Sequence, residues 1–133
     1  MDAKGRITVP SRHREALSAL CADQLTITRH PVGCLLVFPR PAWEAFRDKL
    51  LTLSMQADGW RRLFLGSAMD VEIDSASRVL VSPELRAAAG LVKDVLLLGN
   101  GQRLELWDPA RHAAHEAEIL AGPMPAALQD FVL

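Results

Sequence analysis

The feature that most constrains how this chain folds is a motif that occurs twice. Residues 2–14 read DAKGRITVPSRHR and residues 74–86 read DSASRVLVSPELR, so the two copies lie 72 residues apart. In each copy an aspartate precedes a basic residue, a short apolar stretch and a proline. Aspartate hydrogen-bonds the backbone that follows it, β-branched residues favour strands, and proline suits the first turn of a helix. Each copy therefore predicts a tight basic turn, a short strand and the start of a helix.

The remainder of the chain repeats the same plan. Gly33 matches Gly101 and Leu36 matches Leu104 at a spacing of 68 residues. In the first half we expect a helix at 10–22, strands at 24–29 and 34–39, an amphipathic helix at 42–53 and a helical stretch at 57–64. In the second half we expect strands at 65–74 and 78–81, a helix at 83–89, a hairpin of 94–99 with 103–107, and a helix at 109–120. A duplication of this kind predicts a pseudo-two-fold fold built from intertwined halves.

The two copies differ at their start. Residues 65–73 predict a strand that leads into the second motif, whereas only Met1 precedes the first. We therefore expect the first half to lack a strand partner, which would leave unpaired backbone groups at a sheet edge. We also expect homo-oligomers of this chain to be less stable or more heterogeneous than those of a chain that carries such a strand.

Length and composition place the chain among ordinary globular proteins. It has 133 residues, of which 50% are hydrophobic and 23% charged, enough for a real core. Its formal net charge of −1 argues against a uniformly basic nucleic-acid binder. However, residues 1–66 carry 10 Lys and Arg against 6 Asp and Glu, whereas residues 67–133 carry 5 against 10. The resulting charges of +4 and −5 predict one basic face, or pairing between copies of the chain.

Several classes of function find no support in the sequence. No apolar run approaches the ~18 residues of a membrane span and no signal peptide is present, so we expect a cytoplasmic protein. Cys21 and Cys34 lack the spacing of a metal or redox site, so we expect buried thiols and no cofactor. Phosphate-binding loops, dinucleotide fingerprints, HExxH and GxSxG are absent, and we expect no enzyme. Asp70, Glu72 and Asp74 would share one strand face, where repulsion is favoured over catalysis.

The residues of both motifs also carry a family resemblance. The pattern DxKGRxxVPxxxR at 2–14, its weaker second copy and the stretch GWRRLFLGSAMDVEID at 59–74 resemble the MraZ family of bacterial regulators, which are double relatives of the SpoVT–AbrB swapped-hairpin domain. The resemblance implies an α+β fold, mainly β with helices, in which two swapped-hairpin repeats form a pseudo-two-fold double-split β-barrel. We place the first repeat at 1–55, a helical connector at 56–64 and the second repeat at 65–133.

The resemblance also implies a function. It predicts a transcriptional regulator that binds short direct repeats in the promoter of the division and cell-wall gene cluster, through the DxKGR-type loops of a ring-shaped homo-oligomer. Its partners would be double-stranded DNA and further copies of itself, with no membrane, and it would be cytoplasmic and associated with the nucleoid. Because swapped-hairpin binders also serve in toxin–antitoxin pairs, the alternative is an antitoxin-like or structural assembly module without promoter-specific regulation.

The predicted DNA-binding residues lie in and behind the two basic turns. They are Lys4, Gly5, Arg6, Arg12, Arg14, Arg78 and Arg86. A glycine beside Lys and Arg lets the backbone approach phosphate while the side chains neutralise it, and Arg can read guanine bidentately. We expect Arg6 to matter more than Arg78, because the first turn offers two cations and a glycine whereas Ser77 restricts the second.

Each of these cations could instead be solvated or ion-paired. The alternatives are a solvated turn for Lys4 and Arg6, a pair of Arg78 with Asp74 or Glu84, and a pair of Arg12 with Glu15. Arg61 and Arg62 favour a patch between domains or subunits over base recognition. His112 and His115 lack the further ligands that a strong metal site needs. The three tryptophans predict core or interface packing; they are Trp43, Trp60 and Trp107.

Overall fold

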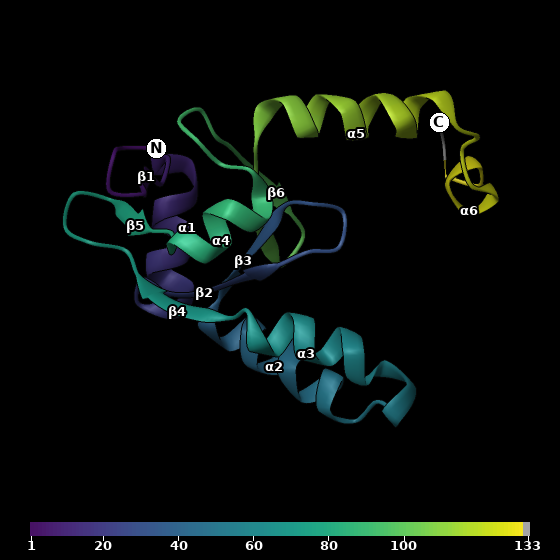
Figure 1. The fold of residues 1–133 in the computed structure, drawn as a ribbon, viewed down its shortest axis with the longest axis horizontal. Coiled ribbons are helices and arrows are strands. Elements are labelled where there is room, and N and C mark those ends of the chain that lie inside the picture. The colour runs from purple at the N-terminus through teal and green to yellow at the C-terminus, as the bar shows by residue number, and fades with distance from the viewer. Residues whose placement is uncertain (132–133) are drawn as a thin grey trace.

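The computed structural model of the protein describes residues 1–131, which form an α+β fold with two antiparallel sheets and six α-helices (Figure 1). Along the chain the elements are β1 (Arg6–Thr8), α1 (Ser11–Cys21), β2 (Gln24–Arg29), β3 (Leu35–Pro39), α2 (Arg40–Leu51), the 3-10 helix η1 (Met55–Ala57), α3 (Asp58–Gly66), β4 (Met69–Glu72), β5 (Arg78–Leu80), α4 (Pro83–Ala89), β6 (Leu96–Asn100), β7 (Arg103–Trp107), α5 (Pro109–Ala121) and α6 (Ala126–Gln129). The predicted α+β class is confirmed.

Local chemistry sets the ends of the helices in the second half. α4 begins with Pro83 and is capped by Ser82, whose hydroxyl accepts a hydrogen bond from the backbone N–H of Leu85 at 3.3 Å. The helix ends at Gly90, whose φ of 66° lies in the left-handed region that glycine adopts readily. α5 starts in the same way, with a proline that follows the capping residue Asp108. These boundaries agree with those predicted from the sequence.

A two-stranded antiparallel ribbon joins the two halves of the chain. β1 of the first motif pairs with β5 of the second, so that Ile7 lies opposite Val79 and Thr8 opposite Arg78. The side chains of Ile7 and Val79 are buried in the core, and the alternation along a strand turns their neighbours outward. The two copies of the motif therefore meet in space, and the predicted intertwining of the halves is confirmed.

The second sheet also combines the two halves. Its strand order is β4-β2-β3-β7-β6, and the two hairpins meet where β3 pairs with β7. Within the described residues, the outer edge of β6 pairs with no strand. Just after β4, the backbone N–H of Ile73 donates to Asp23 O, just before β2, at 2.9 Å. The equivalent bond in the other half is made by the ammonium group of Met1, which donates to Lys93 O, before β6, at 2.6 Å.

One apolar core is shared by both repeats. Its buried members are Ile7, Val9, Leu17, Cys21, Leu25, Ile27, Leu35, Val37, Ile73, Val79, Val81, Leu85, Ala89, Leu91, Leu104 and Leu106. Because both halves supply these side chains, this core forms only when the two repeats are together. Cys21 and Cys34 are both buried, which confirms the expectation of buried thiols, and burial raises the pKa of the Cys34 thiol to about 12.

A second apolar cluster lies under the helical hairpin of α2 and α3. Phe38 from β3 packs against Trp43 and Phe46 of α2 at ring-centroid distances of 5.7 and 5.1 Å, and Phe64 of α3 meets Phe46 edge-on at 5.4 Å. Trp60 does not join this cluster, since 56% of it is exposed. The expectation of core packing is therefore confirmed for Trp43 and Trp107, whereas for the exposed Trp60 the expectation of interface packing stays a prediction.

Two further expectations, both about residues 65–74, are corrected by the structure. The strand predicted at 65–74 is shorter, because α3 continues to Gly66 and packs Leu65 against the second apolar cluster. Asp74 therefore lies beyond β4, in the turn before β5, and does not share a strand face with Asp70 and Glu72.

The strands of residues 1–131 form an open sheet and a ribbon without closing a barrel. No helix in the described residues is long and apolar enough to cross a membrane.

Candidate nucleic-acid interface

A single aspartate shapes the first basic turn, residues 2–5, here called the first loop. Asp2 Oδ1 accepts hydrogen bonds from the backbone N–H groups of Lys4 and Arg6, both at 2.9 Å. Its Oδ2 accepts from Arg6 Nε at 2.7 Å. These hydrogen bonds, led by the one from the Arg6 backbone, lower the pKa of the Asp2 carboxyl from 3.8 to about 2. The carboxylate thus fixes both the turn and the side chain of Arg6.

The second loop, residues 74–77, repeats this construction. Asp74 Oδ1 accepts from the backbone N–H groups of Ala76 at 2.9 Å and Arg78 at 2.8 Å, and Oδ2 accepts from Arg78 Nε at 3.2 Å. The hydrogen bond from the Arg78 backbone is the largest cause that lowers the pKa of this carboxyl. Of the alternatives for Arg78, the pair with Asp74 is the one that forms within the described residues. Arg6 has the equivalent pair with Asp2.

Both loops end in a residue with positive φ, and each is bonded to the other half. Gly5 has a φ of 89° and Ser77 a φ of 62°. The backbone O of Gly5 accepts from Val81 N at 2.9 Å, and that of Ser77 accepts from Val9 N at 2.8 Å. The expectation that serine would restrict the second loop is therefore corrected in one respect, because Ser77 adopts the same left-handed conformation as Gly5.

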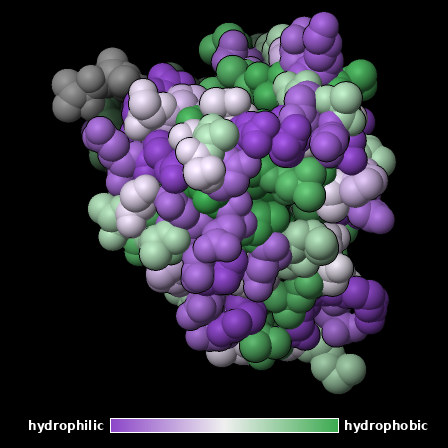
Figure 2. All heavy atoms as spheres, turned by 90° about the vertical axis from the view of Figure 1, so that its left-hand side faces the viewer, coloured by the Kyte–Doolittle hydropathy of each residue, from purple (hydrophilic) through white to green (hydrophobic). Residues whose placement is uncertain are grey.

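The two arginines lie on the outer face of the ribbon. Arg6 is opposite Leu80 and Arg78 is opposite Thr8, while the buried Ile7 pairs with Val79 on the inner face. Because β1 and β5 are antiparallel, the loops that precede them lie at opposite ends of the ribbon. Figure 2 shows the side of the molecule that bears both loops, where hydrophilic side chains predominate and hydrophobic ones are interspersed. Lys4 is exposed at the tip of the first loop.

The remaining predicted site residues lie on the helices that follow the motifs. Arg12 on α1 is exposed, and within the described residues it forms no ion pair with Glu15. Arg14 and Arg86 are half-buried, and each lies against the loop of the other half rather than its own. Arg14 Nη1 donates to Ser77 Oγ at 2.8 Å, and Arg86 packs beside Gly5. Comparing the two motifs in the sequence did not indicate that each arginine would contact the loop of the other motif.

The histidines of α5 belong to a different surface. His115 stacks on Trp107 with ring centroids 5.3 Å apart, and His112 meets the same ring edge-on at 5.4 Å. They line a cavity of about 360 Å³ together with His30 and Glu105. Within the described residues, no group of three or more His, Cys, Asp or Glu side chains has the arrangement of a metal site.

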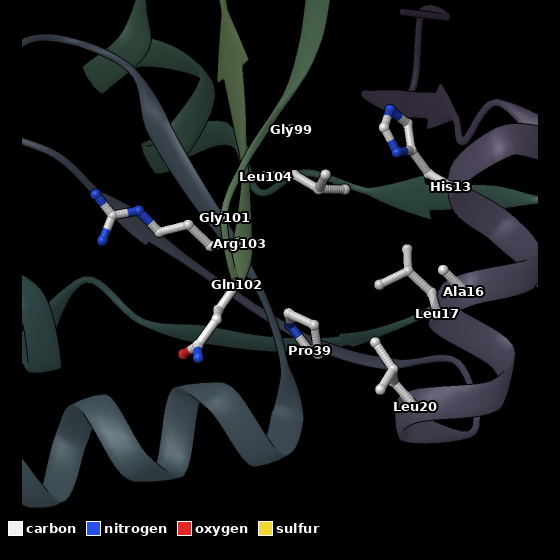
Figure 3. A pocket seen from close by; sticks show the side chains of 10 residues that line it. All are labelled: His13, Ala16, Leu17, Leu20, Pro39, Gly99, Gly101, Gln102, Arg103 and Leu104. Carbon is white, nitrogen blue, oxygen red and sulfur yellow. The ribbon is translucent and has the colours of Figure 1, made fainter. Parts of the chain in front are cut away.

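An apolar cavity of about 220 Å³ separates α1 from the β6–β7 hairpin (Figure 3). His13, Leu17 and Leu20 project into it from α1, whereas Arg103 points to the other side of the hairpin. The Nε2 atom of His13 is buried and has no hydrogen-bond partner in residues 1–131, and burial lowers the pKa of this histidine. None of the loop cations Lys4, Arg6 and Arg78 lines this cavity. Nothing in the sequence indicated that His13 would be placed here.

Comparison with known proteins connects this architecture to one family. The family described as "MraZ protein, putative antitoxin-like" matches the chain twice, at residues 1–63 and 64–131. A protein of Leptothrix cholodnii named "Transcriptional regulator MraZ" is 67% identical over 131 residues, which cover 98% of this chain and 90% of the relative. Relatives of the same name from Methylibium petroleiphilum and Variovorax paradoxus are 66% and 60% identical over the same length, covering 90% and 92% of their own chains.

Proposed function

Since this chain belongs to the MraZ family, a family of regulators rather than enzymes, we propose that it is a DNA-binding transcriptional regulator that recognises specific sequences. One observation carries the proposal. Two loops of the same construction, each an aspartate that orients an arginine, lie at the two ends of one exposed ribbon. A cation that is oriented before it meets DNA loses little side-chain freedom on binding.

The two kinds of cation have different roles in the proposed complex. Arg6 and Arg78 read base edges, because a guanidinium can donate two parallel hydrogen bonds to guanine. The exposed ammonium group of Lys4 neutralises a phosphate and sets the register of the loop without reading sequence. Gly5, the buried last residue of the loop, supports both contacts through its positive φ, which fixes the turn that carries Lys4 and leads into Arg6.

We propose further that the target is a set of short direct repeats in the promoter of the division and cell-wall gene cluster, and that the active form is a ring of identical chains. A ring presents the same pair of loops at regular intervals, and direct repeats have matching intervals. Binding through several weak loops makes the overall affinity depend on multivalency. The +4 and −5 charges of the two halves support head-to-tail contact between copies. Such a regulator would work in the cytoplasm, associated with the nucleoid.

A mobility-shift assay tests this proposal directly. The full chain is titrated into a duplex that carries short direct repeats of the proposed promoter, and into a scrambled duplex of equal composition. Preference for the repeats, reduced when their spacing is changed by half a helical turn, supports the proposal. Equal affinity for both duplexes contradicts it.

The alternative function is an antitoxin-like or assembly module. The words "antitoxin-like" in the family's description are the reason to test it. The same assay distinguishes the two. An antitoxin-like module would bind a partner protein through the helical surfaces and would show no preference for promoter repeats. A footprint that covers only the repeats favours the regulator.

A further inference from the structure

Arg14 reaches from the first repeat into the second loop. Its Nη1 donates to Ser77 Oγ at 2.8 Å and to the backbone O of Asp74 at 3.2 Å. Its Nη2 pairs with Asp23 Oδ2 at 3.2 Å, and its Nε faces Ser18 Oγ at 3.5 Å. All three guanidinium nitrogens therefore have partners within the protein, and only 22% of the side chain is exposed. A guanidinium engaged in this way has little left to offer a phosphate.

Ser77 is the residue of the second loop that most needs support. Its φ of 62° places it in the left-handed region, where a Cβ atom crowds the backbone. Gly5 takes the matching place in the first loop without that cost, because it has no Cβ. The hydrogen bond from Arg14 secures the side chain of Ser77 at the point where the loop turns into the strand that carries Arg78.

The first loop has a related arrangement in which packing replaces hydrogen bonding. Arg86 of α4 lies against Gly5, so closely that a Cβ atom there would be 2.7 Å from both Cζ and Nε of the arginine. Arg86 Nε donates to Val81 O at 3.0 Å, and Val81 N donates to Gly5 O at 2.9 Å. In both halves, an arginine of one repeat thus supports the loop of the other.

From this geometry we infer that Arg14 is a positioning residue for the second DNA-contacting loop and not itself a DNA contact. The inference rests on the proposed function and assigns Arg14 to a different role from Arg6 and Arg78. Arg14 holds Asp74 and Ser77, the two residues that begin and end the loop, and so determines how Arg78 is presented. The helix of one repeat thereby controls recognition by the other.

A rescue experiment separates positioning from contact. Affinity is measured by fluorescence anisotropy on a duplex that carries the short direct repeats of the proposed promoter, with the full chain as wild type, Arg14→Ala, Ser77→Gly and the double variant. Arg14→Ala should weaken specific binding roughly tenfold, as expected for loss of charged hydrogen bonds that order the loop. Ser77→Gly should restore most of that loss, because glycine adopts positive φ unaided. No recovery in the double variant would overturn the inference.

The conservative variant and the salt dependence give a second test. Arg14→Lys keeps the charge but cannot bond several partners at fixed angles, so it should resemble Arg14→Ala. A phosphate contact would instead tolerate lysine, and its loss would reduce the slope of log affinity against log salt by about 0.9. We expect an unchanged slope in both variants. Recovery with lysine, or a reduced slope, would contradict the positioning role.

Combining substitutions tests whether the support crosses between repeats. Arg14→Ala should add little to Arg78→Ala, since both disable the second loop, but should add fully to Lys4→Ala in the first. Arg86→Ala should show the reverse pattern. If Arg14→Ala merely destabilised the whole protein, its effect on affinity would combine in the same way with substitutions in either loop. If Arg14 contacted DNA itself, its effect would be non-additive with substitutions in the first loop, which belongs to its own repeat. Either result would refute the inference.

A measurement without DNA keeps this inference distinct from the proposed function. In the free protein, amide resonances of residues 74–78 should shift in Arg14→Ala while those of residues 2–6 stay in place. The control is Arg12→Ala, which removes an exposed arginine from the same helix and should shift neither loop. If the wild-type chain shows no preference for the repeats, the proposed function fails. If the chain prefers the repeats but the resonances of residues 74–78 do not shift in Arg14→Ala, only the role of Arg14 is overturned.

Discussion

At the scale of single residues, one aspartate organises each loop and its arginine together. Asp2 and Asp74 accept two backbone hydrogen bonds from the loop that follows and a third bond from the guanidinium four residues on. All of these partners lie within four residues, so the turn can be predicted from local sequence. As a consequence, the side chain of each arginine is oriented before any partner binds.

Arg6→Ala should abolish specific DNA binding while leaving the fold intact. Arg6 lies on the outer face of the ribbon and is only half-buried, so little packing is lost, whereas a bidentate base contact is worth about 1–3 kcal/mol per loop. Anisotropy titrations at moderate salt measure the loss, and Arg62→Ala, with 75% of its side chain exposed on α3, is the matched control. Unchanged affinity in the Arg6 variant would be inconsistent with the proposed contact.

Arg6→Ala should also weaken binding more than Arg78→Ala. Both arginines pair with their aspartate, but only the first loop carries a second cation, Lys4, and a glycine at its positive-φ position. The two variants are compared on one duplex under one salt condition. A larger loss for Arg78→Ala would show that the second loop makes the dominant contact.

The order of the first loop should be lost only in strong acid. The hydrogen bonds from Arg6 lower the pKa of Asp2 to about 2, below its ordinary value of 3.8. A carboxyl whose pKa is lowered by folding stabilises the folded form above its ordinary pKa, and this contribution disappears as the pH falls from 3.8 towards 2. Carbonyl resonances of Asp2 followed from pH 6 to about pH 1.5 should give a midpoint near 2. A midpoint near 3.8 would show that the loop leaves this carboxylate unbonded in solution.

At the scale of elements, the α2–α3 hairpin depends on a residue whose role the sequence did not indicate. The sequence favoured a patch between domains or subunits for Arg61 together with Arg62. Instead its guanidinium donates to the backbone O atoms of Leu50, Leu53 and Ser54 at 3.0, 2.6 and 3.0 Å, and closes the end of α2 onto α3. Carbonyl groups at a helix end lack partners within the helix, so a side chain that reaches them stabilises the turn.

Arg61→Ala should therefore lower the free energy of unfolding by about 1–3 kcal/mol, since it leaves these carbonyl groups without their charged donor. The neighbouring Arg62→Ala removes only an exposed pair with Asp58 and should change stability by about 0.5 kcal/mol or less. Urea unfolding followed by tryptophan fluorescence compares the two. Similar effects of both substitutions would mean that Arg61 does not brace the hairpin.

At the scale of the whole molecule, the two repeats are complete only together. They share one core and one ribbon, and β3 pairs with β7 across the repeats. One position breaks the symmetry. β2 is covered by β4, whereas the outer edge of β6 has no partner within residues 1–131, although Met1 already bonds to the chain just before it. An unpaired edge of this kind favours association out of register.

Extending the chain before Met1 by a copy of residues 66–72 should therefore make its assemblies more uniform. The added segment can continue from the hydrogen bond between Met1 and Lys93 and pair along β6, as β4 pairs along β2. Light scattering coupled to size exclusion, run on both chains across a salt series, compares them. Identical sharp oligomers would remove the role given to the edge, and monomers in both cases would contradict the proposed ring.

The sequence by itself determined what depends on neighbours along the chain. Asp2, Pro83 and Gly90 act through bonds and torsions within a few residues, so the turns, the start and end of α4 and the duplicated plan could all be predicted.

Only the tertiary structure decided what depends on residues far apart. Arg14 and Ser77 are 63 positions apart, and nothing in either motif indicates that the arginine of one serves the loop of the other. The same holds for the exposure of Trp60 and for the reach of Arg61 to the end of α2. Such contacts arise because β1 crosses to β5 and brings the halves into one core, and chain crossing leaves no periodic pattern in either half.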